Sequence, residues 1–110
     1  MGKSQRAKGS RGQTAAAHLL RDRDWQVEVL SCGLMHEDLI GTYPQGGRYS
    51  VEVKNCKTIS LEHRKQAMRQ AKERGLNWML MSHIEGTRCW LIQRQSERPC
   101  VWEEKQDNIS

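Results

Sequence analysis

The chain has 110 residues, 36% of them hydrophobic, with a net charge of +5 and a pI near 9.3. This length allows one domain with a single core and leaves no room for a second module. No apolar stretch approaches the length of a membrane span, and the N-terminus lacks the apolar run of a signal peptide. We therefore expect a cytoplasmic protein with no membrane partner. The scattered cysteines form no CxxC pair and predict neither a disulfide framework nor a zinc site.

The basic charge is unevenly placed along the chain. Residues 1–12 contain cations and no acid, residues 61–75 form a second basic stretch, and the segment after Pro99 is acidic. Two basic segments favour a polyanionic partner, although a solvated helix face has the same composition. We divide the chain into a flexible basic N-terminal arm, a folded core and an acidic C-terminal tail, at residues 1–10, 11–94 and 95–110.

The first half of the chain predicts one helix and three strands. Apolar residues at helical spacing predict a helix over residues 11–23, and alternation predicts a strand over 25–29. A second strand starts at 38–41 and a third covers 48–54. The intervening residues 41–47 are rich in turn formers, which favours a hairpin between the second and third strands.

The second half predicts one more helix and two strands. A helical composition over residues 60–74 ends at Gly75, and strands follow over 77–81 and 88–93. The order αβββαββ predicts an α/β protein with a central mixed β-sheet of about five strands flanked by helices. Three tryptophans stand at strand positions and are expected in the core: Trp25, Trp78 and Trp90. The fourth, Trp102, lies in the acidic tail and is a candidate dimer contact.

The third strand has the most informative pattern. Strict alternation places Glu52 and Lys54 on one face, and Val51 and Val53 on the other. The predicted hairpin would bring Asp38 beside Glu52 and Lys54. Two carboxylates and a cation facing one pocket suit a Mg²⁺-dependent phosphodiesterase. The alternative is an ordinary half-exposed strand with its charges in solvent.

The order of elements, with an acid opening the second strand and Glu-x-Lys on the third, resembles the PD-(D/E)xK nuclease superfamily. Within it, the chain is most similar to the small Holliday junction resolvases of archaea, phages and viruses, from about Lys8 to Gln93. The matching segments, in the family's order and spacing, are Lys8-Gly9, Ser31-Cys32-Gly33, Asp38-Leu39-Ile40 and Val51-Glu52-Val53-Lys54. The resemblance implies a restriction-endonuclease-like core.

The resemblance also implies roles for the residues of the site. Asp38, Glu52 and the backbone carbonyl of Val53 would hold one or two Mg²⁺ ions, for which Mn²⁺ is a possible substitute. Lys54 would orient the attacking water or stabilise charge in the transition state. Ser31 corresponds to the family's loop serine, which would bind a phosphate or position the substrate; a turn hydroxyl is the alternative.

Two positions depart from the family's pattern. Glu37 stands at the nominal proline before the acid and could add a carboxylate, with His36 beside it as a further candidate ligand. Gln13, by register from Lys8-Gly9, stands where these resolvases usually have a metal-site glutamate. A glutamine offers an amide oxygen without charge, which leaves room for weakened metal binding or a catalytically degenerate member.

The resemblance implies an endonuclease that makes paired symmetric nicks in Holliday junctions, in a bacterial, archaeal or phage-infected cell. A chain without a separate recognition domain favours recognition of DNA shape, and the symmetry of a four-way junction favours a homodimer. The alternatives are a nicking or repair nuclease on branched or mismatched DNA, and a nucleic-acid-binding protein with a lost site. The residues predicted to contact DNA are Arg6, Lys8, Arg11, Arg64, Lys65 and Arg69.

Overall fold

The computed structural model describes the backbone of residues 2–32, 36–55 and 58–105, and the side chains of 12–30, 39–55 and 58–105. The elements in this part of the chain are α1 (Gly2–Asp22), β1 (Gln26–Cys32), β2 (His36–Thr42), β3 (Arg48–Lys54), α2 (Leu61–Arg74), β4 (Asn77–His83), β5 (Cys89–Arg94) and β6 (Cys100–Glu103).

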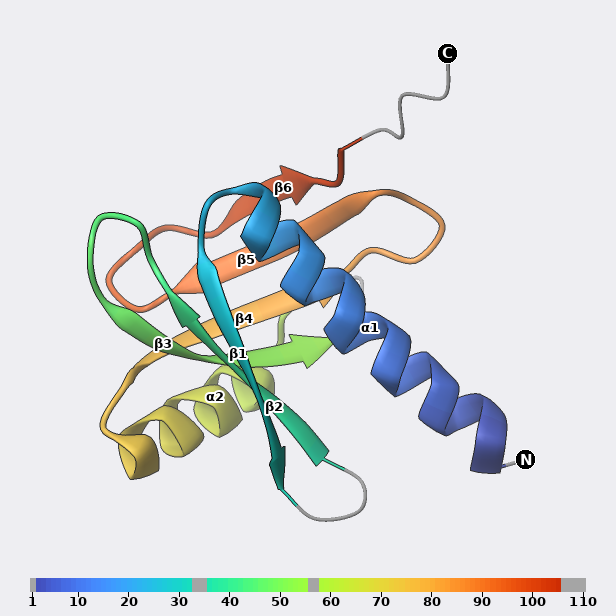
Figure 1. Cartoon of the computed structure of the whole chain (residues 1–110), viewed down its shortest axis with the longest axis horizontal. Helices are drawn as coiled ribbons and strands as arrows, with labels where there is room; N and C mark the ends of the chain where they lie inside the picture. Colours follow the sequence, from blue (N-terminus) through green and yellow to red (C-terminus); the bar gives the residue numbers. More distant parts are fainter. Residues whose placement is uncertain (1, 33–35, 56–57, 106–110) are drawn as a thin grey trace.

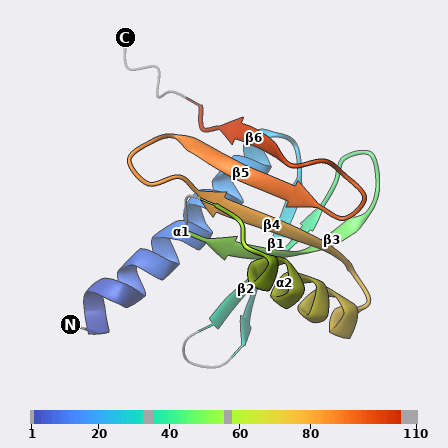
Figure 2. The same cartoon turned by 180° about the vertical axis from the view of Figure 1, so that it is seen from behind.

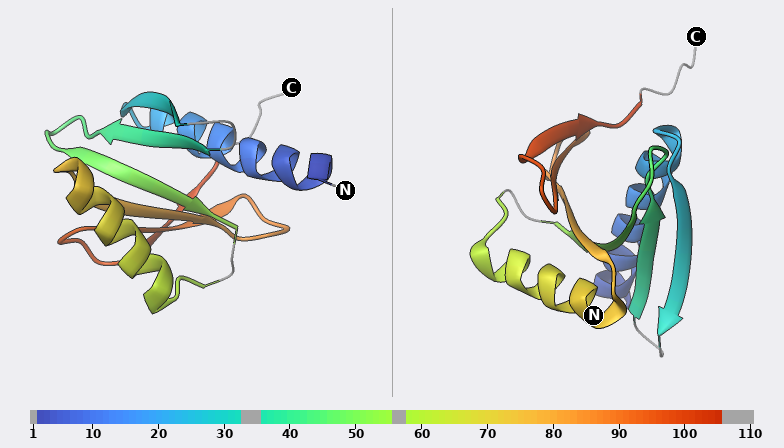
Figure 3. Two further views of the ribbon diagram at one scale, coloured as in Figure 1. Left: turned by 90° about the horizontal axis from the view of Figure 1, so that it is seen from below. Right: turned by 90° about the vertical axis from the view of Figure 1, so that its left-hand side faces the viewer.

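The strands form one mixed sheet that separates the two helices (Figures 1 and 2). Within the described residues the strand order is β1-β2-β3-β4-β5-β6, with β3 and β4 parallel and the other neighbours antiparallel. α1 covers one face and α2 the other (Figure 3). The predicted mixed sheet between helices is therefore confirmed. None of the described helices is long and apolar enough to cross a membrane.

The sheet has one strand more than the predicted number of about five. The added strand, β6, comes from the segment assigned to the acidic tail and pairs with β5, with Trp102 opposite Trp90. Its four residues are mostly exposed at the edge of the sheet. A segment this short has no clear period of its own, so its strand conformation depends on the neighbouring β5.

Helix α1 begins at Gly2, well before the predicted start at residue 11. The early residues include good helix formers such as Gln5, Arg6 and Ala7, and no proline interrupts them. The side chains of residues 1–11 lie outside the described part of the chain. The division into an arm and a core therefore stays a prediction.

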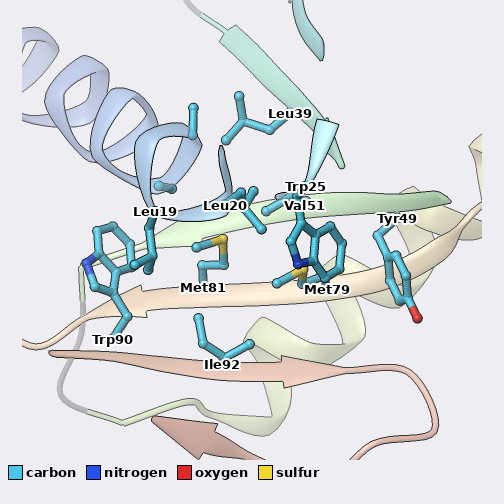
Figure 4. Packing of buried hydrophobic residues seen from close by; sticks show 12 residues of the cluster. Leu19, Leu20, Trp25, Leu39, Tyr49, Val51, Met79, Met81, Trp90 and Ile92 are labelled. Atoms are coloured by element: carbon cyan, nitrogen blue, oxygen red, sulfur yellow. The ribbon is translucent and has the colours of Figure 1, made fainter. Parts of the chain in front are cut away.

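The main core lies between α1 and the sheet (Figure 4). Strand alternation selects its members: Met79 and Met81 pack in this cluster, whereas Leu80 between them faces the other side. Burial of such side chains stabilises the fold by about 1.5–3 kcal/mol each. The cluster consists of Ala16, Ala17, Leu19, Leu20, Trp25, Leu39, Tyr49, Val51, Met79, Met81, Trp90 and Ile92.

Helix α2 has defined signals at both ends. Ser60 is the N-cap: its Oγ accepts from the His63 backbone N–H at 3.2 Å, and His63 Nδ1 accepts from the Ser60 N–H at 3.3 Å. Gly75 follows the last turn with φ 68°, a left-handed conformation that glycine adopts without penalty. The predicted end of this helix is therefore confirmed.

The inner face of α2 packs on β3 and β4. Ala67 and Ala71 are buried there, and their small side chains let the helix lie close to the sheet. In the last turn, Arg74 Nη1 donates to Ser50 Oγ at 3.0 Å. This hydrogen bond fixes the end of α2 over the beginning of β3.

An aromatic cluster closes the end of the sheet where β3 begins. The guanidinium carbon of Arg94 lies 4.8 Å from the ring centroid of Tyr43, 5.6 Å from that of Trp25 and 5.8 Å from that of Tyr49. Trp102 makes an edge contact with Trp25 at 6.2 Å between centroids. The partly buried Trp102 thus packs within its own chain, whereas the sequence made it a candidate dimer contact.

The predicted positions of the other tryptophans are confirmed in two of three cases. Trp25 and Trp90 are buried, whereas Trp78 is only half-buried. Trp78 lies on the α2 side of β4, as its register beside Ser50 shows.

Candidate active site

The strands β2 and β3 diverge at the position of the predicted site. They are paired from Thr42 opposite Arg48 to Leu39 opposite Val51, and beyond this point they run apart (Figure 1). The next residues are Asp38 on β2 and Glu52 on β3. The predicted hairpin is therefore confirmed, and it places the backbones of these two acids at the same fork. The side chain of Asp38 lies outside the described residues.

Glu52 and Lys54 occupy the β3 side of the fork and contact one another. Lys54 Nζ lies 3.4 Å from Glu52 Oε1, and the side chains are 25% and 18% exposed, respectively. The predicted placement on one face is confirmed. Within the described part of the chain no other ion pair or hydrogen bond holds either side chain. Mostly buried charges with one partner each have hydrogen-bonding capacity left for a ligand.

The other face of β3 contacts helix α1 at the same level. Val53 packs against the main core, and a Cβ added to Gly12 would lie 3.8 Å from Val53 Cγ1. Helix α1 therefore crosses β3 at Val53, on the face opposite to Glu52 and Lys54. Gln13, the next residue of α1, is half-buried and interacts with another residue. This places Gln13 at the level of the site, while its role there stays a prediction.

The basic residues of α2 differ in their surroundings. Lys65 and Arg69 are exposed, whereas Arg64 is half-buried, and its Nε has no accessible surface and no hydrogen-bond partner within the described residues. The sequence analysis predicted the same role for all three residues. Arg64 could have been distinguished from the other two, because it precedes the buried Ala67 and Ala71 by three and seven residues and so shares their helix face.

Several predicted site residues have side chains outside the described part of the chain. These are Ser31 and the three basic residues of the first helix, Arg6, Lys8 and Arg11, together with the candidate ligands His36 and Glu37. The backbone of Ser31 lies on β1 opposite Glu37, so this residue is in a strand and not in the loop or turn that the sequence predicted. Their proposed contacts stay predictions.

The donors at the fork suit a hard divalent cation. The described part of the chain offers the Glu52 carboxylate and the Val53 carbonyl, and the backbone of Asp38 stands across the fork from Glu52. These are oxygen ligands of the kind Mg²⁺ prefers. Among the described side chains, no group of three or more His, Cys, Asp or Glu is placed to hold a metal ion, and the side chain of Asp38 lies outside them.

Comparison with known proteins shows a likeness in fold. No protein-family model matches the chain, and no curated protein matches its sequence. Among solved structures, it is similar to Hjc, a Holliday junction resolvase from the archaeal hyperthermophile Archaeoglobus fulgidus, with a TM-score of 0.51 and 13% sequence identity. The similarity covers 81% of this chain and 85% of that chain. The chain therefore has the fold of a small archaeal Holliday junction resolvase, as its resemblance to this type of PD-(D/E)xK nuclease predicted.

Proposed function

We propose that the protein is a Mg²⁺-dependent, structure-specific DNA endonuclease that resolves four-way junctions. The observation that carries the proposal is the Glu52–Lys54 pair, with 3.4 Å between Nζ and Oε1, on the strand that diverges from Asp38. The likeness to an archaeal Holliday junction resolvase supports it, because the two proteins share a fold over 81% of this chain.

Hydrolysis of a phosphodiester needs an activated water and positive charge on the reacting phosphate. Asp38, Glu52 and the carbonyl of Val53 would hold the metal. Mg²⁺, when bound, supplies a more acidic water and offsets phosphate charge. Lys54 is positioned by Glu52 and keeps N–H groups free to hold the water or a phosphate oxygen. Gln13 would hold a water through its amide oxygen without adding charge.

We infer the substrate class from charge and from the symmetry of a four-way junction. A net charge of +5 favours a polyanion. A four-way junction needs two symmetric nicks, so we infer a homodimer with one site in each subunit. Gln13 supports a second candidate, a DNA-binding protein that holds junctions without cutting them.

The test is incubation of a labelled synthetic four-way junction with the protein in Mg²⁺ or in EDTA. The wild type should make paired symmetric nicks in Mg²⁺ only, and Glu52→Gln should lower the cleavage rate by about 10³-fold or more while binding is kept. Glu28→Gln is the matched control, since this exposed carboxylate of β1 lies outside the fork and pairs with Arg48 at 3.6 Å.

The same assay separates the alternatives. Tight junction binding without cleavage in Mg²⁺ or Mn²⁺ would contradict the nuclease and favour the binding protein. Equal cleavage of flapped, nicked or mismatched duplexes would instead indicate a nicking or repair nuclease.

A further inference from the structure

Arg64 is set apart from the other arginines of α2 by an unsatisfied donor. Its Nε has no accessible surface and donates no hydrogen bond within the described residues. No described carboxylate forms an ion pair with it. The positions three and four residues away on the helix are Ser60, Leu61, Ala67 and Met68, so no acid lies next to it on α2. An unpaired, partly buried guanidinium is costly for the fold.

The inner face of α2 carries Arg64 toward the fork. Arg64, Ala67, Ala71 and Arg74 are spaced by three and four residues, and the two alanines are buried against the sheet. Arg74 is fixed to Ser50 near the start of β3. Helix α2 follows β3 after a short connection and runs back beneath it (Figure 3).

The lengths of the two elements indicate where Arg64 lies along β3. Ten helical residues from Arg74 back to Arg64 span about 15 Å. Four strand residues from Ser50 forward to Lys54 span about 13 Å. Arg64 is therefore level with the end of β3 that bears Glu52 and Lys54, on the same face of the sheet. Lys65 and Arg69 are exposed instead.

We propose that Arg64 binds a phosphate of the DNA strand held at Glu52 and Lys54, and that it positions that strand for cleavage. A planar guanidinium with unused N–H donors matches two non-bridging oxygens of one phosphodiester. The capped N-terminus of α2 adds a favourable dipole at the same end of the helix. This proposal rests on the proposed nuclease function and assigns a single phosphate contact within it.

The test compares Arg64→Met with Arg98→Met, at an exposed arginine between β5 and β6 that is not among the predicted DNA contacts. Junction binding is measured by fluorescence anisotropy over a salt series in Ca²⁺, cleavage is measured in Mg²⁺, and thermal unfolding is measured for each variant. For Arg64→Met we expect cleavage to fall about 10-fold or more and the slope of log K against log salt to fall by about 0.9. Its melting temperature should be unchanged or higher, because a buried unsatisfied donor is removed.

A purely structural role predicts the opposite pattern for Arg64→Met, namely a lower melting temperature with an unchanged salt slope, and this would overturn the proposal. Arg64→Lys keeps the charge but loses the planar fork, and it should lie between wild type and Arg64→Met in cleavage. It also provides the test if Arg64→Met does not fold.

The outcome for Arg64 is separable from the outcome for the nuclease. If the wild type cuts junctions and Arg64→Met cuts equally well, only this proposal fails. If the wild type does not cut, the proposed nuclease fails, and the salt slope alone decides whether Arg64 contacts a phosphate.

Discussion

The two ends of β3 use charged side chains in opposite ways. At the amino end, the guanidinium of Arg94 is surrounded by the rings of Trp25, Tyr43 and Tyr49. At the carboxyl end, Glu52 and Lys54 pair with one another, and no other described side chain pairs with either. The aromatic rings stabilise the Arg94 cation within the fold. The Glu52 carboxylate and the Lys54 ammonium group, by contrast, have hydrogen-bonding capacity left for a ligand.

This difference shows that the net positive charge of the chain does not form one uniform basic surface. Arg94 stabilises the closed end of the sheet, while Lys54 lies where β2 and β3 diverge. We therefore expect changes at the amino end to alter the free energy of unfolding and changes at the carboxyl end to alter catalysis. Three substitutions test this contrast.

The largest expected effect is on stability, at the amino end. Trp25 is 4% exposed and touches Tyr43, Tyr49 and Trp102. Trp25→Ala should lower the free energy of unfolding by about 3–5 kcal/mol, because it leaves a cavity in the core. Urea unfolding followed by circular dichroism measures this loss. Trp78→Ala, at a half-buried position, is the control and should cost less; equal losses would mean that the aromatic cluster has no special role.

The next effect is on catalysis, at the carboxyl end. Lys54→Met should lower the single-turnover cleavage rate by about 10²–10³-fold, because a preorganised cation at the reacting phosphate is lost. The melting temperature should fall by less than for Trp25→Ala, because the mostly buried Glu52 loses its ion pair but no cavity opens in the main core. Lys72→Met, at an exposed lysine of α2, is the matched control. Loss of stability without loss of cleavage would assign Lys54 to the fold instead.

The smallest of these effects sharpens the contrast between two arginines. Arg94→Met should lower the free energy of unfolding by about 1 kcal/mol, since its contacts with aromatic rings are lost. Cleavage by the folded fraction should be unchanged. Arg64 has no such contact with a described aromatic ring, so Arg64→Met should not lower the free energy of unfolding. Thermal unfolding of the two variants side by side measures the difference, and equal destabilisation would remove the distinction between the two ends.

Local pattern was sufficient to predict much of the fold and part of the site. Strict alternation over residues 48–54 gave the bounds of β3 and the common face of Glu52 and Lys54, both confirmed. Gly75 marked the end of α2 because few other residues adopt its left-handed conformation without strain. The turn-rich residues 41–47 indicated the hairpin that brings the backbone of Asp38 to the fork.

The sequence by itself determined the elements whose signals lie within a few residues of one another. Only the tertiary structure decided that Cys100–Glu103 forms a strand, because its pairing partner is β5. It also decided that Arg94 meets rings from three other segments, while Arg64 lies on the inner face of α2 and pairs with none of the described carboxylates. Periodicity assigns a residue to a face, but the partner on that face comes from a distant part of the chain, and packing alone brings the two together.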